Sequence, residues 1–289
     1  MVSWAITGAT RGIGVSIPIS SQRPQREMLT RPPLQLGFVK NLSTDSKNQV
    51  FALIRSLGTA GPLLELAAQR KNIHVIVTDI SDPTKLDDAA AEVSKATAGS
   101  LDVLLLNAGS AGPDTAVLPP SAFHGKKEAL DFEINESIKD NLLSNMYTIN
   151  AFLHLIRSGA EKKVVFISSQ SGNLDFTRRT GFSTLLGYSV SKAGMNMAMT
   201  KFAGELAPEG IKTLSLSPGW VDTDAAKAVT GDPEVRRFVL DMFHKVDAKV
   251  EGPAPVGEAV SDMLRVIGGL DEVDSGKFLT HHGDEEQWF

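Results

Sequence analysis

The sequence contains no cysteine, and this absence excludes several kinds of site. Without a thiol the chain can form no disulfide, hold no zinc ion through thiolates and use no cysteine as a nucleophile. Long apolar runs are also missing, because none approaches the roughly 18 residues that a membrane-spanning helix needs. We therefore expect no transmembrane helix and no disulfide framework.

Neither sign of charge is in large excess. The chain has 29 Lys and Arg against 34 Asp and Glu, and the net charge of −5 argues against a nucleic-acid-binding surface. Apolar residues make up 42% of the sequence, enough for a packed core. The start, Met1-Val2-Ser3-Trp4-Ala5-Ile6, lacks the basic and long apolar regions of a signal peptide and is interpreted as a strand. We expect a cytoplasmic protein that binds neither nucleic acid nor a membrane.

Short β-branched runs alternate with helical patterns along the chain. Most runs are apolar throughout, as strands buried on both faces are: Val2–Thr7, Gln49–Ile54, His74–Thr78, Leu101–Asn107, Lys163–Ser168, Lys212–Ser217 and Lys277–Thr280. The expected helices are Gly61–Arg70, Leu86–Ala96, Ile134–Arg157, Tyr188–Leu206 and Val256–Ile267. This alternation predicts an α/β fold, a doubly wound parallel sheet of the Rossmann type with about seven strands and helices on both faces. No linker or repeat divides the chain, so we expect a single domain.

Residues 15–35 do not fit this pattern. The segment holds four of the 14 prolines where a helix should begin, and the pair Pro32-Pro33 cannot lie inside a helix. When the segment is removed on paper, an apolar helical stripe forms from Ile13, Phe38, Val39 and Leu42. We interpret residues 15–35 as an insertion, with an ordinary surface loop as the alternative. Its 21 codons would be 63 nucleotides, in frame, so a translated intron is our hypothesis, which sequencing of transcripts would test.

A glycine-rich turn, Thr7-Gly8-Ala9-Thr10-Arg11-Gly12-Ile13-Gly14, follows the first expected strand. Glycines let the backbone approach a pyrophosphate, and the helix that follows offers free N–H groups and a positive dipole end. The spacing resembles the T-G-x-x-x-G-x-G motif of short-chain dehydrogenases/reductases. The resemblance implies one NAD(P)-binding oxidoreductase domain over residues 1–289, whose turn contacts the cofactor through Gly8, Thr10, Arg11, Gly12, Ile13 and Gly14.

Arg55 ends the second expected strand. It lies 41 residues after Gly14, or 20 when the insertion is discounted, and a spacing of about 20 places a side chain at the adenosine ribose. A carboxylate there would bind the ribose 2′-OH, whereas a guanidinium suits a 2′-phosphate. We therefore expect NADPH to be preferred over NADH, with Arg11 as a second cation. The alternative is that Arg55 is a solvated arginine at a strand end.

Three later elements also resemble cofactor contacts of this family. The third strand ends in Asp79-Ile80, where an aspartate contacts adenine in the family, although capping of the next helix is an equal alternative. The fourth strand ends in Asn-Ala-Gly, and a P-G-x-V-x-T sequence follows the sixth. The resemblance assigns these elements to the cofactor through Asp79, Ile80, Asn107, Ala108, Gly109, Pro218, Gly219, Val221 and Thr223.

Tyr188 and Lys192 form the expected catalytic pair. At positions i and i+4 they share one face of a helix. A tyrosine pKa of about 10 is too high for a proton relay at neutral pH, and we expect the nearby ammonium to lower it. By resemblance to the family, Tyr188 donates the proton, and Lys192 also binds the nicotinamide ribose.

The resemblance assigns a serine and an asparagine to the same catalytic set. Ser169 ends a buried strand and is expected to hydrogen-bond the substrate carbonyl. Ser168 and Ser171 remain alternatives because the 19 residues from Ser169 to Tyr188 exceed the usual interval. Asn150 matches the asparagine of the family's proton relay, with a hydrogen bond to helix backbone as the alternative.

One interval departs from the family pattern. Asn107 and Asn150 are 43 residues apart, which is longer than usual. We therefore expect Ser110–Asn135 to form an additional loop and short helix.

The C-terminal Ser275-Gly276-Lys277-Phe278, with Gly283 and Trp288, is similar to small fungal carbonyl reductases of the norsolorinic-acid type. The resemblance implies NADPH-dependent hydride transfer to or from the carbonyl or alcohol of a small organic substrate, and it allows a homo-oligomer. The alternative is an NAD(P)-binding protein without turnover, either a sensor or an inactive form carrying a translated intron. We expect no metal site, since adjacent His281 and His282 point in different directions in an extended chain.

Overall fold

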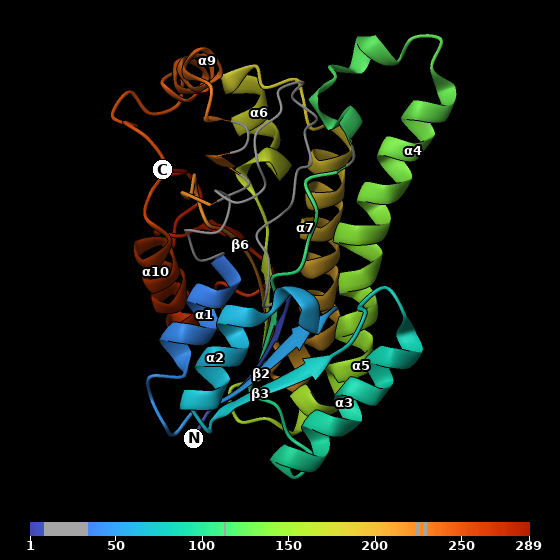
Figure 1. The fold of residues 1–289 in the computed structure, drawn as a ribbon, viewed down its shortest axis with the longest axis vertical. Helices are drawn as coiled ribbons and strands as arrows, with labels where there is room; N and C mark the ends of the chain where they lie inside the picture. The colour runs from blue at the N-terminus through green and yellow to red at the C-terminus, as the bar shows by residue number, and fades with distance from the viewer. Residues whose placement is uncertain (9–33, 113, 224–225, 228–229) are drawn as a thin grey trace.

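Seven parallel strands form a single sheet in the order β3-β2-β1-β4-β5-β6-β7 (Figure 1). The computed structural model describes residues 1–8, 34–112, 114–223, 226–227 and 230–289. The strands are β1 Ser3–Thr7, β2 Gln49–Ile54, β3 Ile73–Val77, β4 Val103–Leu106, β5 Lys163–Ile167, β6 Lys212–Ser217 and β7 Phe278–Thr280. The strand order reverses direction between β1 and β4, as in a doubly wound sheet, so the predicted fold class is confirmed.

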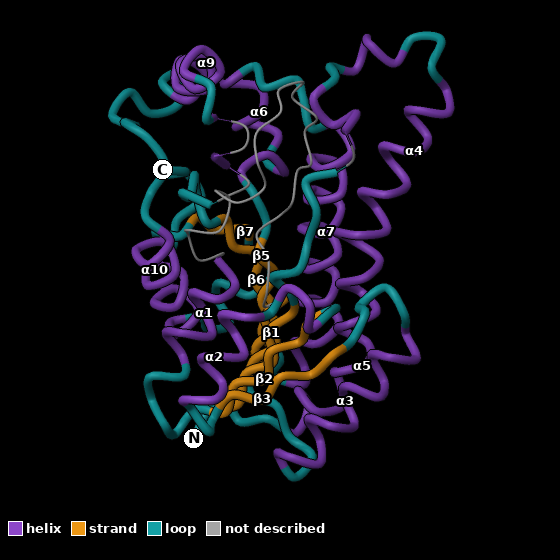
Figure 2. The backbone as a smooth tube through the Cα atoms, viewed as in Figure 1, coloured by secondary structure: helices purple, strands orange, loops and turns teal. Residues whose placement is uncertain are grey.

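Helices cover both faces of the sheet (Figure 2). One face carries α1 (Leu34–Leu42), α2 (Gly61–Gln69) and α10 (Val256–Gly269), and the other carries α3 (Pro83–Thr97), α5 (Ser144–Ser158) and α7 (Leu186–Leu206). Successive side chains of a strand point to opposite faces, so each strand supplies two cores. Ile6 of β1 lies in the core under α1 and α10, whereas its neighbour Ala5 lies in the core under α3, α5 and α7.

The first helix has the apolar stripe that the sequence predicts. Phe38 and Val39 are fully buried, and Leu42 is nearly so. They lie in the same core cluster as Val256 of α10. Ile13 and most of the 15–35 segment lie outside the described residues, so the insertion stays a prediction.

The expected helix Ile134–Arg157 differs from the structure. The chain becomes helical earlier, in α4 (Lys127–Ile138), and then forms a π-helical turn, Lys139–Leu143, before α5 begins. The start of α4 therefore lies within Ser110–Asn135, where a loop and short helix are expected, but the helix continues past that range. Sequence periodicity missed α4 because its buried face is partly polar: among its residues, Glu133 and Ser137 are buried.

A third cluster of apolar side chains lies beyond the carboxyl ends of the strands. It joins α6 (Leu174–Thr180) and α9 (Pro233–Phe243), which lie at the top of Figure 1, with the C-terminal tail, which ends between α9 and α10 in that view. The Phe176 ring centroid lies 5.9 Å from that of Trp288 and 6.0 Å from that of Phe243. These aromatic contacts fix the elements that surround the edge of the sheet where the predicted site residues lie.

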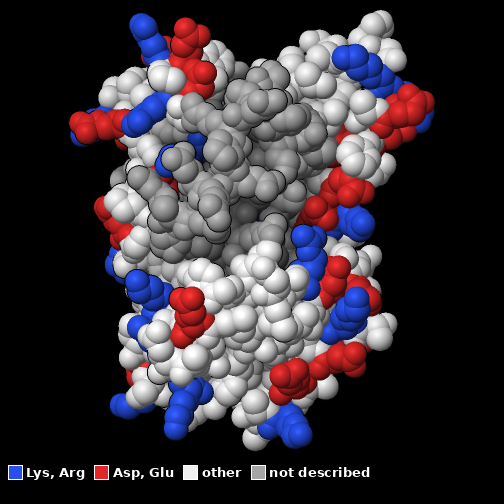
Figure 3. Space-filling view, in the orientation of Figure 1, with Lys and Arg blue, Asp and Glu red and all other residues white. Residues whose placement is uncertain are grey.

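The surface of the described residues shows no concentration of one charge on the face seen in Figure 3, where acidic and basic side chains are interspersed. A search of the same residues for a helix long and apolar enough to cross a bilayer finds none.

Candidate active site

The ends of β1 and β4 are joined by Thr7. Its hydroxyl oxygen accepts hydrogen bonds from the backbone N–H groups of Asn107 and Ala108, each at 3.0 Å. The Asn107 side chain donates in return to the Thr7 carbonyl oxygen at 3.1 Å. The Asn-Ala-Gly element therefore lies against the start of the glycine-rich turn, and Thr7 is a residue to which the sequence pattern gave no role.

Gly8 is the first residue of the turn, and its conformation requires glycine. Its φ is +72°, and a Cβ at this position would lie 2.8 Å from the Cα of Ala108. The backbones of the two segments are therefore in direct contact. The remaining predicted turn contacts, Thr10, Arg11, Gly12, Ile13 and Gly14, lie outside the described residues and stay predictions.

Arg55 is exposed at the end of β2, and its charge acts on two carboxyl groups. Asp79 follows β3, and Asp140 lies in the π-helical turn. Burial raises the pKa of Asp140, and Glu136 raises it further, while Arg55 opposes both effects. Burial also acts to raise the pKa of Asp79, but hydrogen bonds from Ser81 and the charge of Arg55 hold it below its ordinary value. Arg55 thus has carboxyl groups near it as well as open solvent.

Asp79 shapes the turn after β3. Its Oδ1 accepts hydrogen bonds from the backbone and the hydroxyl of Ser81, at 3.0 and 2.8 Å. The cap of α3 is Asp82, whose side chain accepts from the backbone of Thr84 and Lys85. The alternative reading of Asp79 as the helix cap is therefore wrong. Ile80, next to it, packs partly buried against the core.

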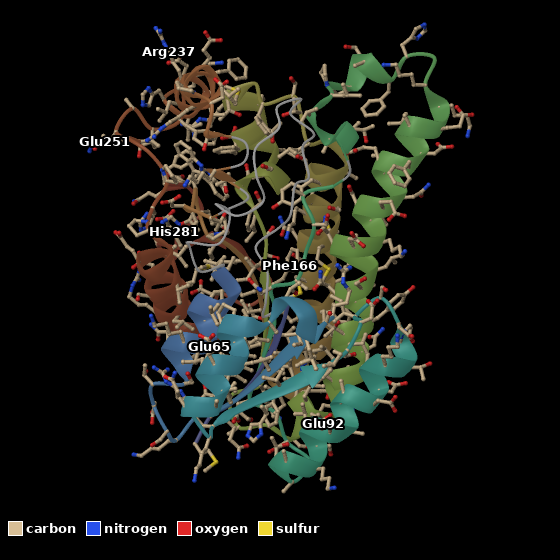
Figure 4. The ribbon with its side chains drawn as sticks, viewed as in Figure 1. Glu65, Glu92, Phe166, Arg237, Glu251 and His281 are labelled. Carbon is tan, nitrogen blue, oxygen red and sulfur yellow. The ribbon has the colours of Figure 1, made fainter. Side chains whose placement is uncertain are left out.

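Tyr188 and Lys192 lie in the first two turns of α7, with exposed fractions of 7% and 2%. The Lys192 Nζ donates a hydrogen bond of 2.7 Å to the carbonyl oxygen of Ile167, the last residue of β5. It also lies 4.5 Å from the ring centroid of Phe166, labelled near the centre of Figure 4, and 5.5 Å from that of Tyr188. The two side chains share one face of the helix, as their spacing predicts.

Burial controls the pKa values of this pair. It raises the pKa of Tyr188 to about 12, and a side-chain hydrogen bond with Ser169 only partly opposes it. It lowers the pKa of Lys192 to about 7. The expectation that the Lys192 charge lowers the tyrosine pKa is therefore wrong, because loss of water favours the neutral form of both groups.

Among the three candidate serines, Ser169 is the one with a side-chain hydrogen bond to Tyr188. The Ser168 hydroxyl donates instead to the Asn196 side chain at 2.6 Å. The backbone N–H of Ser171 donates to the Ser169 hydroxyl oxygen at 3.2 Å and so helps to orient it. This geometry favours Ser169 over the two alternatives.

Asn150 does not lie with this group. It is exposed on the outer face of α5, where it lines a shallow hollow together with Asp87 and Lys95 of α3 and His154. A different asparagine, Asn141 of the π-helical turn, lies near Lys192 beside Gly109. The assignment of Asn150 to the site is therefore corrected to Asn141.

Asn141 is fully buried in the π-helical turn. Its amide nitrogen donates to the Ser110 carbonyl oxygen at 2.8 Å and to the Ser191 hydroxyl at 3.1 Å, and its oxygen accepts from the Ser110 N–H at 2.8 Å. A Cβ on Gly109 would lie 2.8 Å from this oxygen and 3.6 Å from the Lys192 Nζ. The sequence held one indication of this. The interval from Asn107 to Asn150 is 43 residues, longer than usual for the family, whereas the interval from Asn107 to Asn141 is 34 residues.

The turn after β6 lies beside the same edge and is held from two sides. The Ser217 hydroxyl donates to the Gln170 side chain at 3.1 Å, which ties the turn to the residue after Ser169. Pro218 and Gly219 come next, and a Cβ on Gly219 would lie 2.7 Å from the His281 ring. Farther along, Val221 forms a parallel bridge with Ala254, and the Thr223 hydroxyl oxygen accepts from the Ala226 N–H at 3.2 Å.

His281 is buried against this turn, and Figure 4 labels it beside α10. Burial, with a smaller contribution from the charge of His282, lowers its pKa to about 4. Within the described part of the chain, no group of three or more His, Asp or Glu side chains is placed to hold a metal ion.

These observations fit a nicotinamide dinucleotide along the edge of the sheet. Gly8 and Ala108 are in close contact at the middle of this edge, where β1 and β4 end. A ligand can therefore approach the backbone there without meeting large side chains. Arg55 offers an exposed guanidinium at the end of β2, where the adenosine ribose of such a ligand lies. Lys192 and Asn141 both lie beside Gly109, and the Lys192 amine is also close to the Tyr188 ring.

Comparison with known proteins identifies the family. A family model for short chain dehydrogenases matches residues 37–234. The chain is 45% identical to the short-chain dehydrogenase/reductase atnB of Arthrinium sp. over 98% of each chain, and 32% identical to AacuF of Aspergillus aculeatus over the full length of both. The structure of NADPH-bound carbonyl reductase from chicken fatty liver superposes with a TM-score of 0.74 at 26% identity, over 99% of this chain and 98% of that one. This chain belongs to the short-chain dehydrogenase/reductase family, whose members are NAD(P)-dependent oxidoreductases.

Proposed function

We propose that the chain is an NADPH-dependent enzyme that interconverts a carbonyl group and an alcohol on a small organic molecule. The observation that carries this proposal is the convergence of Ser169, Tyr188 and Lys192 at the end of β5. Further support comes from the chicken relative, a carbonyl reductase that binds NADPH.

Each side chain of the group has a chemical role in this proposal. The Ser169 hydroxyl hydrogen-bonds the substrate oxygen, and the Tyr188 phenol donates a proton to that oxygen. A phenol with a pKa of about 12 is protonated at neutral pH, so Tyr188 is ready to act as a proton donor in the direction of reduction. Bound NADPH supplies the hydride.

Lys192 and Asn141 support the proton transfer. Because its pKa is about 7, Lys192 can both hold and release a proton near neutral pH. The proton that Tyr188 gives up is replaced through this amine. Asn141 holds Ser110 and Ser191, and so fixes the wall of the site next to the lysine. Asn141, rather than Asn150, is thus the asparagine of the relay.

The activity is tested by replacement of one hydroxyl. Tyr188→Phe is expected to lower kcat by at least about 10³-fold on any ketone that the parent reduces, since general acid catalysis contributes about 10² to 10⁴. Binding of NADPH, measured by its fluorescence, should change little. Tyr147→Phe, which removes the other tyrosine, 37% exposed on α5, is the matched control. A Tyr188→Phe variant that keeps most of its activity would remove Tyr188 from the mechanism.

The preference for NADPH is supported by the exposed guanidinium of Arg55. A hydrogen bond to a charged group contributes about 1.5 to 3 kcal/mol, so Arg55→Ala should weaken NADPH binding by roughly 10- to 100-fold. NADH binding should change by less than about threefold, because NADH has no 2′-phosphate. Equal losses for both cofactors would contradict the proposed contact.

The second candidate function is NAD(P) binding without turnover, as a sensor or as an inactive form. One observation favours it: the family match begins at residue 37, after the segment 15–35. An assay of NADPH consumption over a panel of ketones and aldehydes, with a parallel binding titration, separates the two. Binding without consumption on any substrate would favour this candidate.

A homo-oligomer is also part of the proposal. Apolar side chains are exposed along the outer faces of α4, α5 and α7, among them Phe132, Tyr147 and Met197. Light scattering after size-exclusion chromatography measures the assembly, and a monomer at micromolar concentration would contradict it.

A further inference from the structure

One carboxylate on α4 holds two segments that border the site. Glu133 is fully buried, and none of the proposed chemistry uses it. Its Oε2 accepts a hydrogen bond of 2.6 Å from the Thr115 hydroxyl. Its Oε1 accepts one of 3.2 Å from the backbone N–H of Gly187. The residue that follows Gly187 is Tyr188.

The start of α7 depends on this contact because the helix has no cap of its own. The residue before the helix, Leu185, has φ +58° and offers no side-chain hydrogen bond to the first turn. The first N–H groups of any helix need acceptors from elsewhere. Glu133 supplies one from a different helix, α4.

Backbone contact between α4 and α7 at this point leaves no room for adjustment. A Cβ on Gly187 would lie 2.5 Å from the Glu133 carbonyl oxygen and 2.6 Å from the Ser137 hydroxyl. The two helices therefore touch where α7 begins, and the register of this contact fixes the backbone that carries Tyr188.

The second hydrogen bond reaches the loop after β4. Thr115 lies in the segment that begins at Ser110, and Ser110 is bound to Asn141. The same segment holds Leu185 in place, since the Ala116 carbonyl oxygen accepts from the Leu185 N–H at 2.6 Å. Both hydrogen bonds of Glu133 thus act on the turn that leads into Tyr188.

We propose that Glu133 is a positioning residue, whose carboxylate sets the start of α7 and thereby holds the Tyr188 phenol against Ser169. The inference rests on the proposed function of Tyr188 as the proton donor. The proposal predicts that the position of Tyr188 depends on the length of the side chain at residue 133 and not on its negative charge.

Two conservative variants separate reach from charge. Glu133→Gln keeps the length: its amide oxygen can accept from Gly187, and its amide nitrogen can donate to Thr115. Glu133→Asp keeps the charge but is one methylene too short to serve both donors. Glu128→Gln, an exposed glutamate on the same helix, is the matched control.

The first measurement is kcat per cofactor-binding site, with sites counted by NADPH fluorescence. Since a misplacement of 1 Å can lower a rate by about 10²-fold, Glu133→Asp should lower kcat by at least about 10-fold, with the KM for NADPH changed less. Glu133→Gln and Glu128→Gln should stay within about threefold of the parent. An aspartate variant as active as the parent, or a glutamine variant as slow as the aspartate one, would overturn the proposal.

The second measurement needs no turnover. With Tyr147→Phe as background, Tyr188 is the only tyrosine left, and a 13C label on its ring reports ionisation by NMR. The parent phenol, with a pKa of about 12, should stay neutral up to high pH. Glu133→Asp should admit water and move the titration toward the value of about 10 for a free tyrosine, while Glu133→Gln should not.

The opposite result, a shift in the glutamine variant alone, would show that the charge acts on Tyr188 and would overturn the proposal. A parent that reduces no carbonyl would contradict the proposed function instead, and the tyrosine titration would still decide the role of Glu133.

Discussion

Tyr188 and Lys192 differ from free side chains because water is excluded from both. Burial raises the pKa of the phenol to about 12 and lowers that of the amine to about 7, so the neutral pair predominates above neutral pH. A neutral phenol is the form that donates a proton.

The low pKa of Lys192 has a consequence for stability. Between pH 7 and its unfolded value of 10.5, the unfolded chain binds a proton at this position that the folded chain does not. The free energy of unfolding should therefore rise with pH across this window, by up to about 1.4 kcal/mol per pH unit from this group. Urea denaturation at pH 7.5 and 9.5 measures the rise. Lys192→Met should lose this component, and an identical pH dependence in both proteins would contradict the assignment.

Asn141 of the π-helical turn and Asn150 of α5 provide a matched pair. Asn141→Ala removes the hydrogen bonds that hold the part-buried backbone N–H and carbonyl groups of Ser110. Loss of such bonds costs about 1 to 3 kcal/mol, and the wall of the site next to Lys192 should then be less well held. We expect a fall in kcat of at least about 10-fold. Asn150→Ala, on the exposed face of α5, should stay within about twofold. Equal kcat values in the two variants would contradict the corrected assignment.

At the scale of elements, the C-terminal tail is held by the third apolar cluster, together with α6 and α9. Trp288 is 3% exposed and packs on the rings of Phe176 and Phe278. Trp288→Ala should lower the free energy of unfolding by about 3 to 5 kcal/mol, as loss of a buried aromatic side chain does. Trp288→Phe should recover part of that loss. Urea denaturation measures both, and a loss below about 1 kcal/mol would mean that the tail is loosely held.

Residues 15–33 of the expected insertion lie between the glycine-rich turn and α1, and its last two residues, Leu34 and Gln35, begin α1. A helix that starts directly at the turn would offer N–H groups and a dipole end to the cofactor phosphates. Deletion of residues 15–35 should therefore tighten NADPH binding, with each recovered interaction contributing about 1 kcal/mol. Titration of NADPH fluorescence compares the two forms. Equal affinities would show that the segment does not disturb the phosphate site.

At the scale of the whole molecule, the proposed ligand contacts come from many elements along one edge of the sheet, so binding should stabilise the entire domain. At 100 times its Kd, a ligand that binds only the folded form adds about 2.7 kcal/mol. NADPH should therefore raise the Tm by several degrees, and equimolar NADH should raise it less if Arg55 selects the phosphate. Differential scanning calorimetry measures both shifts. An equal shift for the two cofactors would remove the support for NADPH preference.

Most of the fold can be predicted from local sequence patterns, namely apolar runs and helical spacing. Strand β2 begins at Gln49 and ends at Ile54, and β6 spans Lys212–Ser217, both as their apolar runs predict. Strands that are apolar throughout must be buried on both faces. Helices must therefore cover both sides of the sheet, as they do in a doubly wound fold. The i and i+4 spacing of Tyr188 and Lys192 likewise placed them on one helix face, because this geometry involves neighbours in the chain only.

The position of the asparagine was decided by packing between distant segments. Polar residues follow one buried face through α4 and α5, namely Ser137, Asn141, Asn145 and Thr148. The chain pattern cannot show that this face is buried until α7 packs against it.

The sign of the tyrosine pKa shift and the role of Glu133 have the same origin. Desolvation depends on every atom around a group, and the acceptor for the start of α7 comes from a residue 54 positions away. The sequence alone determined the sheet, most of the helices that cover its two faces and the set of residues at the strand ends. Only the tertiary structure decided which of those residues meet and which charge states they favour, because burial and hydrogen bonding between remote segments are set by packing and not by local order.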